Sequence, residues 1–295
     1  MALPTVAYQA SAAGTNASII SVVGPKLHGM LITAGWTLEY ADADAIGGGS
    51  AGNPAWDKAY SSGALAGTVV YRMPANGHTT AWFAKFSLGW GTSSAAQVVP
   101  RFVQCGTGHD GSGTLTGGGT GITPTLSTGA TGNVGHMLSV SEDGFVACWN
   151  GSSATGALLL VERVRAADGT VTDDARTILK PNMSIWYRRF YSAAGGESDE
   201  RDLVFLSRLA DGGAVLSAVT TLADTEGLST SPIVGPYLVG PALLGAPPRH
   251  FLILAASDTG ANANVTLTVD GADHTYRTSD NSSMHPAGYV AVAMD

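Results

Sequence analysis

The stretch YRMPANGHTTAWFAKFSLGWG, from Tyr71 to Gly91, decides how the fold of this chain is interpreted. Its second half places Trp82, Ala84 and Phe86 at alternate positions, which predicts a strand that buries one face. In its first half, Pro74–Thr79 is predicted to form the hairpin turn, with the Asn-Gly pair at 76–77 as its turn pair. The stretch is therefore predicted to form a strand, a tight turn and a second strand.

The same stretch raises the question of a binding or catalytic site, because it carries two tryptophans and a histidine. We interpret His78 as a turn residue rather than a catalytic base, since it directly follows the Asn-Gly pair. Trp90 lies beyond the alternating run and beside Gly91. We therefore expect Trp90 to be the aromatic side chain nearest an intersubunit interface.

Upstream of this stretch, apolar residues recur at helical spacing and predict an N-terminal helix over residues 15–35. Gly35 is the expected C-cap, and Pro25 predicts a kink or break near Gly24-Pro25. The segment before the helix, residues 1–14, is expected to reach out to a neighbouring subunit.

Downstream, short apolar runs alternate with Gly-rich turns, which is typical of antiparallel β structure. Asp-Gly pairs at 143–144, 211–212 and 270–271 predict hairpins, and a further turn is expected at 168–169 before a short continuation. Pro100 predicts an edge strand or a break within the run from 97 to 105. The Gly/Thr-rich segment from 106 to 135 is interpreted as a long loop that is too poor in apolar residues to contribute to a core.

These patterns predict a mainly β fold: an antiparallel β-sandwich or barrel-like architecture with one N-terminal α-helix and long Gly/Thr-rich loops. We expect one large β-rich domain over 1–295, with possible sub-division near 106–135 or 240–250. Cys105 and Cys148 end similar strings, FVQC and FVAC, which could lie on neighbouring strands. Free buried thiols are favoured, and a disulfide between them is the alternative.

The composition argues against two classes of partner. Net charge is −8 and only 13% of residues are charged, whereas nucleic-acid binding draws on clustered cations. The one short basic cluster, Arg188-Arg189, is interpreted as an exposed strand end. No run of about 20 apolar residues is free of breakers, so no membrane-spanning helix is expected.

Several motifs could carry chemistry, and each has a simpler interpretation. Gly106, Gly108 and Gly111 match G-x-G-x-x-G, but the residues that follow cannot start the helix that a dinucleotide site needs. The pair His109-Asp110 could bind a metal or orient a base, although a turn with an Asx-type Asp is favoured. Both residues are kept as candidate interface residues, together with Trp90.

The acidic residues and tryptophans leave further alternatives open. The Asp-x-Asp pattern in EYADADA (39–45) suggests a weak Ca²⁺ site, against a favoured solvated loop. Carboxylates brought together by the fold could act as in a glycosidase. Four tryptophans could line a sugar-binding groove, although buried tryptophans in a β core are commoner. They are Trp56, Trp82, Trp90 and Trp149. No cofactor and no catalytic or metal-ligating residue is assigned.

The order of these segments resembles a type of virion structural protein of tailed bacteriophages, found at the neck, tail or capsid. The resemblance lies in Leu31–Gly91, with VYRMP followed by W-F-A-K-F-x-L-G-W-G, and in CWN…LLLVERVRAADGTVTDD and the final GYVAVAM. It implies a non-enzymatic, multi-copy, β-rich component of the virion, whose partners are copies of itself and other phage structural proteins. A carbohydrate- or host-receptor-binding module of the phage tail, contacting a host surface glycan, is the alternative. A polysaccharide hydrolase is the second.

Overall fold

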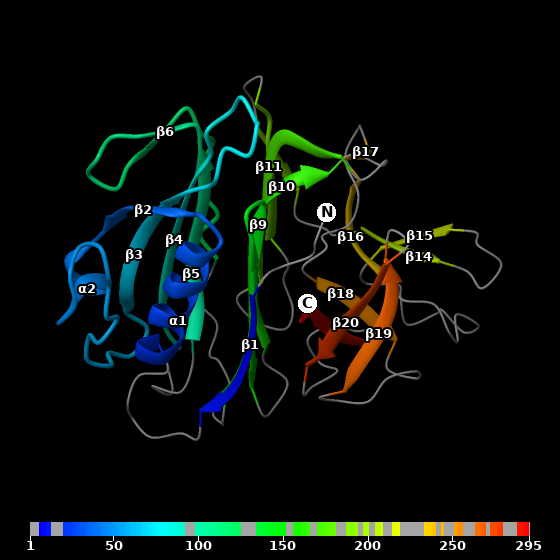
Figure 1. Cartoon of the computed structure of the whole chain (residues 1–295), viewed down its shortest axis with the longest axis horizontal. Coiled ribbons are helices and arrows are strands. Elements are labelled where there is room, and N and C mark those ends of the chain that lie inside the picture. The colour runs from blue at the N-terminus through cyan, green and yellow to red at the C-terminus, as the bar shows by residue number, and fades with distance from the viewer. Residues whose placement is uncertain are drawn as a thin grey trace.

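The strands of this chain form three multi-stranded sheets and one two-stranded ribbon, accompanied by two helices in the part of the chain described here (Figure 1). The structure, a computed structural model, describes residues 6–12, 20–91, 98–124, 134–151, 156–165, 170–180, 187–193, 197–200, 204–208, 214–218, 233–239, 243–244, 251–255, 263–269, 272–279 and 288–294. Every strand pair within these ranges is antiparallel. The prediction of a mainly β, antiparallel, sandwich-like fold with an N-terminal helix is confirmed.

The first sheet has four strands in the order β2-β3-β4-β5. Their bounds are Thr37–Ala41 (β2), Leu65–Arg72 (β3), Phe83–Trp90 (β4) and Val98–Gly106 (β5). Asn76 and Gly77 have positive φ angles of 44° and 82°, and the His78 N–H donates to the Ala75 carbonyl at 2.6 Å. The predicted Asn-Gly turn is therefore confirmed. β5 is an edge strand of this sheet, as Pro100 predicts, and its register with β4 shifts beside that proline.

The second sheet has seven strands in the order β1-β8-β9-β10-β11-β12-β13. Their bounds are Val6–Ala12 (β1), Val134–Ser141 (β8), Gly144–Gly151 (β9), Gly156–Arg165 (β10), Val171–Lys180 (β11), Tyr187–Tyr191 (β12) and Glu197–Glu200 (β13). The β8–β9 hairpin is confirmed, but Ser141 pairs with Gly144, so its turn lies one residue earlier than predicted. β11 is a strand of ten residues and not the short continuation expected.

The N-terminal segment corrects a further expectation. Residues 6–12 do not reach away from the molecule, because they pair with residues 134–140 of β8 in the same chain. Pairing satisfies backbone N–H and C=O groups that an extended arm would leave to water or to a neighbour.

The third sheet is built from the C-terminal third of the chain in the order β15-β14-β16-β18-β21-β20-β19, with β17 paired to β16. The bounds are Val204–Arg208 (β14), Ala214–Ala218 (β15), Ile233–Val239 (β16), Leu243–Leu244 (β17), Phe251–Ala255 (β18), Asn264–Val269 (β19), Ala272–Thr278 (β20) and Gly288–Ala293 (β21). The pairings β14–β15 and β19–β20 confirm the two predicted hairpins. Their Asp-Gly pairs lie outside the described residues, as does the turn at 168–169.

The N-terminal helix α1 spans Ile20–Thr33. Gly35 has φ 87°, its N–H donates to the Ile32 carbonyl, and the Trp36 N–H donates to the Leu31 carbonyl, so the predicted C-cap is confirmed as a Schellman motif. The break predicted near Pro25 is wrong, since α1 continues through it. Pro25 lies in the second turn, where its missing N–H costs one hydrogen bond near the helix end. Residues 15–19 lie outside the described ranges.

A second, one-turn helix, α2 (Ala43–Ile46), was not expected from the sequence. Asp42 caps it, because its side chain accepts a hydrogen bond from the Ala45 N–H at 2.8 Å. The stretch interpreted as a solvated acidic loop thus begins a helical turn, and Ala45 belongs to the buried core.

One hydrophobic cluster joins α1 to the first two sheets. β5 approaches β10 and β11, while α1 contacts β2 and β8, so the helix fills the space between the two sheets. At the centre, the Phe86 ring from β4 lies 5.5 Å from the Phe145 ring of β9, centroid to centroid. Trp82, Ala84 and Phe86 are each at most 1% exposed, so their predicted core face is confirmed, although Trp82 lies just before β4.

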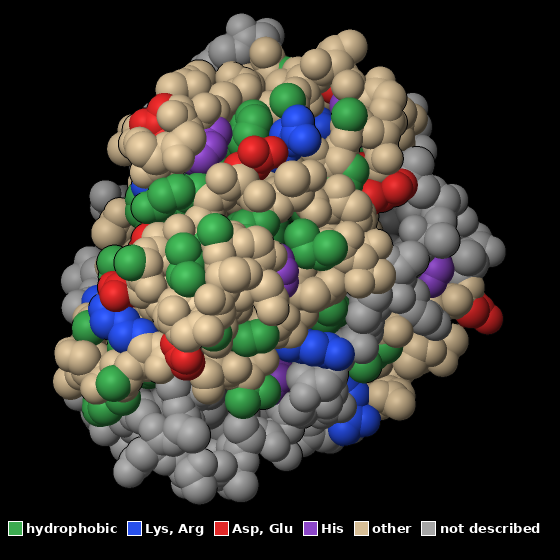
Figure 2. Space-filling model, turned by 60° about the vertical axis from the view of Figure 1, so that its left-hand side comes forward, with side chains coloured by type: hydrophobic (Ala, Val, Ile, Leu, Met, Phe, Trp, Pro, Cys, Tyr) green, Lys and Arg blue, Asp and Glu red, His purple; other side chains and the backbone are tan. Residues whose placement is uncertain are grey.

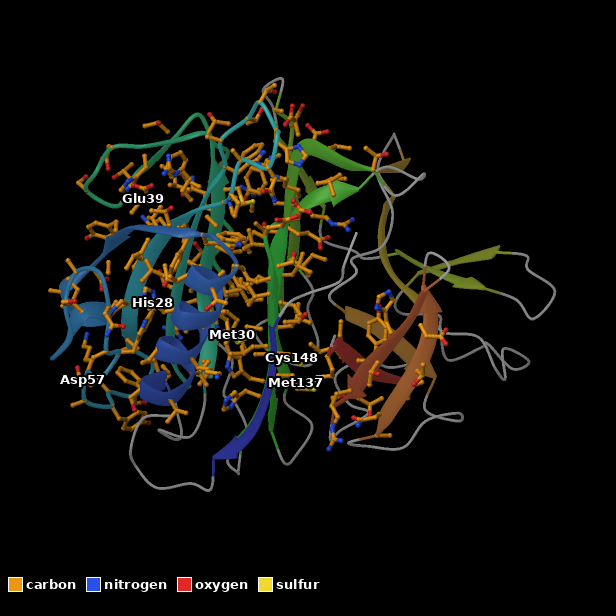
Figure 3. All side chains as sticks on the ribbon, viewed as in Figure 1. His28, Met30, Glu39, Asp57, Met137 and Cys148 are labelled. Carbon is orange, nitrogen blue, oxygen red and sulfur yellow. The ribbon has the colours of Figure 1, made fainter. Side chains whose placement is uncertain are left out.

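The opposite face of the seven-stranded sheet is buried as well. Met137 and Cys148 are cross-strand neighbours on β8 and β9 (Figure 3) and are at most 1% exposed. Leu158 and Leu160 of β10 are fully buried on the same face. Since β21 contacts β8, the C-terminal sheet lies against this side, and the seven-stranded sheet is a middle layer (Figure 1).

The two cysteines lie in different sheets. Cys105 is on β5 and Cys148 on β9, so the idea of neighbouring strands is wrong. Both are free and buried, as favoured. Burial raises the pKa of the Cys105 thiol, which keeps it protonated and unreactive.

The first part of the Gly/Thr-rich segment is more ordered than expected. Residues 106–124 include a ribbon of β6 (Gly108–His109) and β7 (Leu115–Thr116). Leu115 is 8% and Ile122 4% exposed, so the segment does contribute to burial. Residues 125–133 lie outside the described ranges. The single domain over 1–295 and its possible sub-divisions stay predictions.

Candidate functional site

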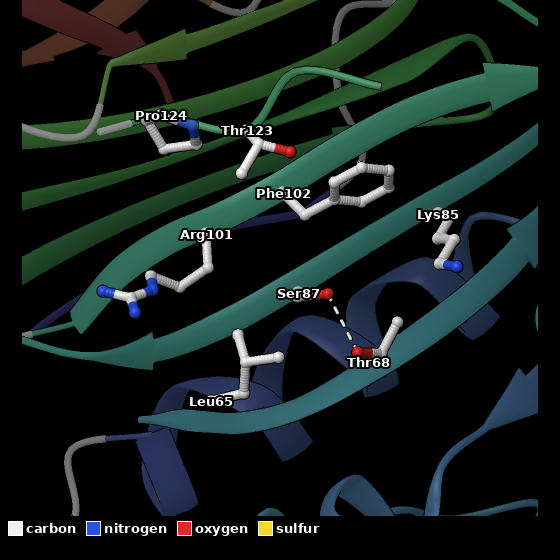
Figure 4. A pocket seen from close by; sticks show the side chains of 8 residues that line it. All are labelled: Leu65, Thr68, Lys85, Ser87, Arg101, Phe102, Thr123 and Pro124. Carbon is white, nitrogen blue, oxygen red and sulfur yellow. Dashed lines mark hydrogen bonds between the residues drawn. The ribbon is translucent and has the colours of Figure 1, made fainter. Parts of the chain in front are cut away.

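A groove of about 530 Å³ opens on the outer face of the four-stranded sheet, opposite the core cluster (Figure 4). Such a volume is within the range of small-molecule sites. Three strands and the segment after β7 supply its lining, which consists of Leu65, Thr68, Lys85, Ser87, Arg101, Phe102, Thr123 and Pro124. The period of two along each strand explains why Thr68, Ser87 and Phe102 point outward while the residues next to them, Val69, Phe86 and Val103, enter the core. Arg101 reaches the outer face as well because the register of β5 with β4 shifts between Pro100 and Phe102.

Local pairing and two glycines shape this groove. Thr68 and Ser87 are cross-strand partners whose hydroxyls are hydrogen-bonded at 2.9 Å. A Cβ at Gly121 would lie 2.1 Å from the Phe102 ring, and one at Gly89 would lie 2.9 Å from the Arg101 side chain. Glycine at these two positions therefore lets the ring and the arginine stem lie flat on the sheet.

The groove carries two cations, and no carboxylate is among the residues that line it. The Lys85 ammonium lies 5.5 Å from the centroid of the Phe102 ring, a cation–π distance. Arg101 donates through Nη2 to the Gly63 carbonyl at 2.5 Å. Burial lowers the pKa of Arg101, although a guanidinium stays charged at neutral pH. Within the described ranges, neither cation has a carboxylate partner.

The structure places His109 and Asp110 in the tight β6–β7 ribbon. His109 is enclosed by the rings of Tyr40 and Phe83, with centroids at 6.1 and 6.2 Å, and its Nε2 accepts the Gly113 N–H at 3.0 Å. Asp110 accepts the Ser112 N–H at 2.7 Å in an Asx turn. Its hydrogen bonds with Ser112 lower the pKa of Asp110. The turn interpretation is confirmed, and their role at an interface stays a prediction.

Trp90 is not where the sequence suggested. It is the last residue of β4 rather than a residue beyond the strand, and it is fully buried in the core cluster. The Trp90 side chain therefore offers no exposed surface of its own to a neighbouring subunit, and its place near an interface stays a prediction. The alternating pattern continues further than the sequence suggested, because Leu88 and Trp90 keep the same inward phase as Phe86.

The tryptophan-lined sugar groove is also contradicted. Trp56, Trp82 and Trp149 are each 1% exposed, and Trp90 is fully buried. These rings pack the core, and none is available to stack on a ligand at the surface.

His78 takes part in a cluster that joins the two N-terminal sheets, which we call the turn clasp: His78, Thr79, Asp143 and Asp173. His78 Nδ1 lies 3.3 Å from the Asp173 carboxylate, and its Nε2 lies 4.0 Å from that of Asp143. The Thr79 hydroxyl donates to Asp173 at 2.6 Å, and this bond lowers the pKa of the Asp173 carboxyl. The clasp fastens the β3–β4 turn to β11 and to the β8–β9 turn.

Two buried arginines reinforce the seven-stranded sheet. Arg163 is 1% exposed and donates to the Thr80 carbonyl at 3.0 Å, beside the turn clasp. Arg176 forms a cross-strand ion pair with Glu162, and both side chains are at most 4% exposed. Arg189 of the predicted exposed basic cluster is only 8% exposed, which corrects that interpretation.

The other candidate motifs have structural partners. Glu39 pairs with Arg72 at 3.1 Å and Asp44 with Lys58 at 2.5 Å, so the carboxylates of the suggested Ca²⁺ pattern point to separate partners. Gly106 and Gly108 lead into the β6–β7 ribbon and not into a helix. No group of three or more potential metal ligands was found among the described residues.

Sequence reasoning did not find the groove. The alternation that buries Trp82, Ala84 and Phe86 leaves Lys85 on the opposite face of the strand, and this is the only local signal for the groove. Arg101 and Phe102 reach that face through the register shift beside Pro100, and the neighbouring Gly121 lies in a segment interpreted as a loop. The pairing that brings them together is not encoded in any local motif.

Comparisons with protein-family models, with curated proteins and with solved structures found no match. Neither helix in the described part of the chain is long and apolar enough to cross a membrane.

Proposed function

We propose that this protein is a structural component of a tailed-phage virion that assembles as a homo-oligomer at the neck, tail or capsid surface. The phage assignment rests on the resemblance of Leu31–Gly91 and the later segments to virion structural proteins. The β-rich layers and the use of the histidines in internal contacts are compatible with a scaffold role. His28 of α1 (Figure 3) is an example, since its Nδ1 lies 2.9 Å from the hydroxyl of Tyr71 on β3, in the buried interior.

The observation that supports self-assembly is a stripe with a single charge on the exposed face of α1, which we call the outer stripe: Val22, Lys26, Gly29 and Ile32. Val22 is 46% and Ile32 44% exposed. A Cβ at Gly29 would meet nothing within 4 Å, and Lys26 is the single charged residue of α1. Spacings of three and four place these residues on one side of the helix.

A second copy of this chain is the occupant that we propose for the outer stripe. On the face shown in Figure 2, charged side chains are few and most of the described surface is uncharged. A stripe with one lysine and two large exposed aliphatic residues is suited to burial against an equally uncharged surface. Symmetric repetition then multiplies contacts that are individually weak.

Sedimentation velocity at micromolar concentration tests self-assembly. We expect the wild-type chain to sediment as an oligomer and Ile32→Glu to shift it toward the monomer, because the new carboxylate would be buried without a partner. Thr37→Glu on β2 is the matched control, since Thr37 is exposed and lies outside the outer stripe. A wild-type chain that remains monomeric would remove the homo-oligomer from the proposal.

Mass spectrometry of purified virions tests the phage assignment separately. The chain should be detected as a multi-copy component of the particle. Its absence from every virion fraction would show that the assignment is wrong, whatever the oligomeric state.

A further inference from the structure

We propose that a second copy of this chain pairs with the outer edge of β1 in antiparallel orientation, so that the two seven-stranded sheets join into one continuous sheet across a two-fold axis. This pairing rests on the self-assembly proposed above and names the backbone surface through which it occurs. β1 pairs with β8 on one side only, because it is the end strand of its sheet.

The geometry of the backbone leaves hydrogen-bonding groups at this edge. In an antiparallel ladder, residues alternate between pairs that exchange both backbone hydrogen bonds and pairs that exchange none. About half of the residues of β1 therefore direct their N–H and C=O groups away from β8. Within the described ranges, no other strand pairs with these groups. A strand from another chain can satisfy them, as β8 satisfies the rest.

The other edges of the first two sheets have features that oppose the addition of a strand. The register of β2 with β3 shifts at the charged residue Glu39. β5 contains Pro100, and its Val103 already exchanges two backbone hydrogen bonds with Ile122, at 3.1 and 2.8 Å. β13, Glu197–Glu200, has three carboxylates in four residues.

β1 has none of these features. Its sequence, VAYQASA, contains no charged residue and no proline, and its seven residues pair with β8 in an unbroken register. In the third sheet, the end strands β15 and β19 are shorter, and at β19 the Arg277 guanidinium donates to the Asn264 side chain at 3.1 Å. Among the described end strands, β1 is therefore the longest without a charge, a proline or a register shift.

Self-complementarity favours a second copy as the partner of this edge. Antiparallel overlap of all seven residues places Gln9 opposite Gln9 of the second copy, and Val6 opposite Ala12. No like charges face each other in this register, although the whole chain has a net charge of −8. Two copies of β13 paired in the same way would bring carboxylates together.

The outer stripe lies on the same side of the seven-stranded sheet's edge. α1 packs against β8, the strand that pairs with β1 (Figure 1). A second copy that pairs with β1 therefore also approaches α1. Strand pairing and the burial of the exposed Val22 and Ile32 side chains can then belong to one interface.

Disulfide cross-linking of the full chain tests the pairing, because residues directly opposite each other on paired strands have Cα atoms about 4.5–5.5 Å apart, within disulfide range. Under mild oxidation at micromolar concentration, Gln9→Cys should form covalent dimers at least about tenfold faster than Val6→Cys. The two Val6 residues of such a dimer lie about 20 Å apart. A mixture of Val6→Cys and Ala12→Cys should again cross-link rapidly, since these positions face each other.

Thr37→Cys on β2 and Thr266→Cys on β19 are the matched controls, as each places a thiol at an exposed position of another end strand. Both should cross-link no faster than Val6→Cys. The native Cys105 and Cys148 are free and buried, so they do not compete with the new thiols. Circular dichroism checks that each variant is folded, and sedimentation velocity gives the oligomeric state of the wild type.

Three results would overturn the edge pairing, and they differ in what else they remove. If the wild type is an oligomer but Gln9→Cys cross-links no faster than Val6→Cys, the edge pairing is wrong and the homo-oligomer stands. Fastest cross-linking by Thr266→Cys would assign the interface to β19 instead. A wild-type chain that stays monomeric would remove both the edge pairing and the homo-oligomer.

Discussion

Trp82 and Trp149 are equally buried, but their indole N–H groups differ in hydrogen bonding. Each is 1% exposed in the core between the first two sheets. The Trp82 indole donates to the main-chain carbonyl of Asp173 at 2.6 Å, whereas the Trp149 indole N–H has no hydrogen-bond partner within the described residues. The difference between them isolates one bond that ties the β3–β4 connection to β11.

We predict that Trp82→Phe lowers the free energy of unfolding by about 1–2 kcal/mol more than Trp149→Phe, because it leaves a buried carbonyl without its donor. Both substitutions remove the same atoms from a buried site, so the loss of packing is similar. Urea denaturation of the two variants and the wild type measures the difference. Equal losses would show that the bond to Asp173 contributes nothing net.

At the scale of elements, substituting alanine for two glycines that face open space should change the free energy of unfolding in opposite directions. Neither Gly77 nor Gly29 has an atom within 4 Å of a built Cβ. Gly77 is in the β3–β4 turn with φ 82°, whereas Gly29 is inside α1. Steric contact within the chain therefore cannot account for any difference between the two alanine variants, provided that unfolding is measured at a concentration where the chain is monomeric.

We predict that Gly77→Ala destabilises the protein by about 1 kcal/mol, because L-residues with a Cβ are strained in the left-handed region. Gly29→Ala should stabilise it by about 0.5–1 kcal/mol through helix propensity. Thermal or urea unfolding at a fixed protein concentration checks both signs. A neutral Gly77→Ala would mean that the turn relaxes to another type.

At the scale of the whole molecule, buried histidines make stability depend on pH. His136 lies on β8 with no exposed surface, and burial lowers its pKa to about 4, from 6.5. Burial also lowers the pKa of His28. In the unfolded chain both imidazoles take up a proton at higher pH than in the folded chain, so acid favours unfolding.

We predict that stability is fully present above pH 6.5 and falls as the pH drops toward about 4, by on the order of 2–3 kcal/mol for His136. Chemical denaturation at several pH values between 7.5 and 4 measures this slope. His136→Gln removes the titrating group and should flatten the curve, even if it lowers stability overall. A slope that is unchanged in His136→Gln would contradict the assignment.

The fold was predictable where it depends on local conformation. The Asn-Gly turn, the Gly35 cap and the inward face of Trp82, Ala84 and Phe86 each follow from the φ preference of one residue or from the period of a strand. The helix α2 was missed because Asp42 was interpreted as part of an acidic loop, although an Asp that precedes a short apolar segment is also an N-cap signal.

The amino-acid sequence by itself determined the antiparallel β class, the N-terminal helix and the hairpins, because these depend on neighbours in the chain. Only the tertiary structure decided that Trp90 is buried, that Asp173 meets Thr79 at a sequence separation of 94 residues, and that Arg101 joins Lys85 in one groove. The physical reason is that burial and charge pairing are properties of packed layers. A strand pattern specifies two faces, and the layer packed against each face determines which one becomes core and which one becomes a site.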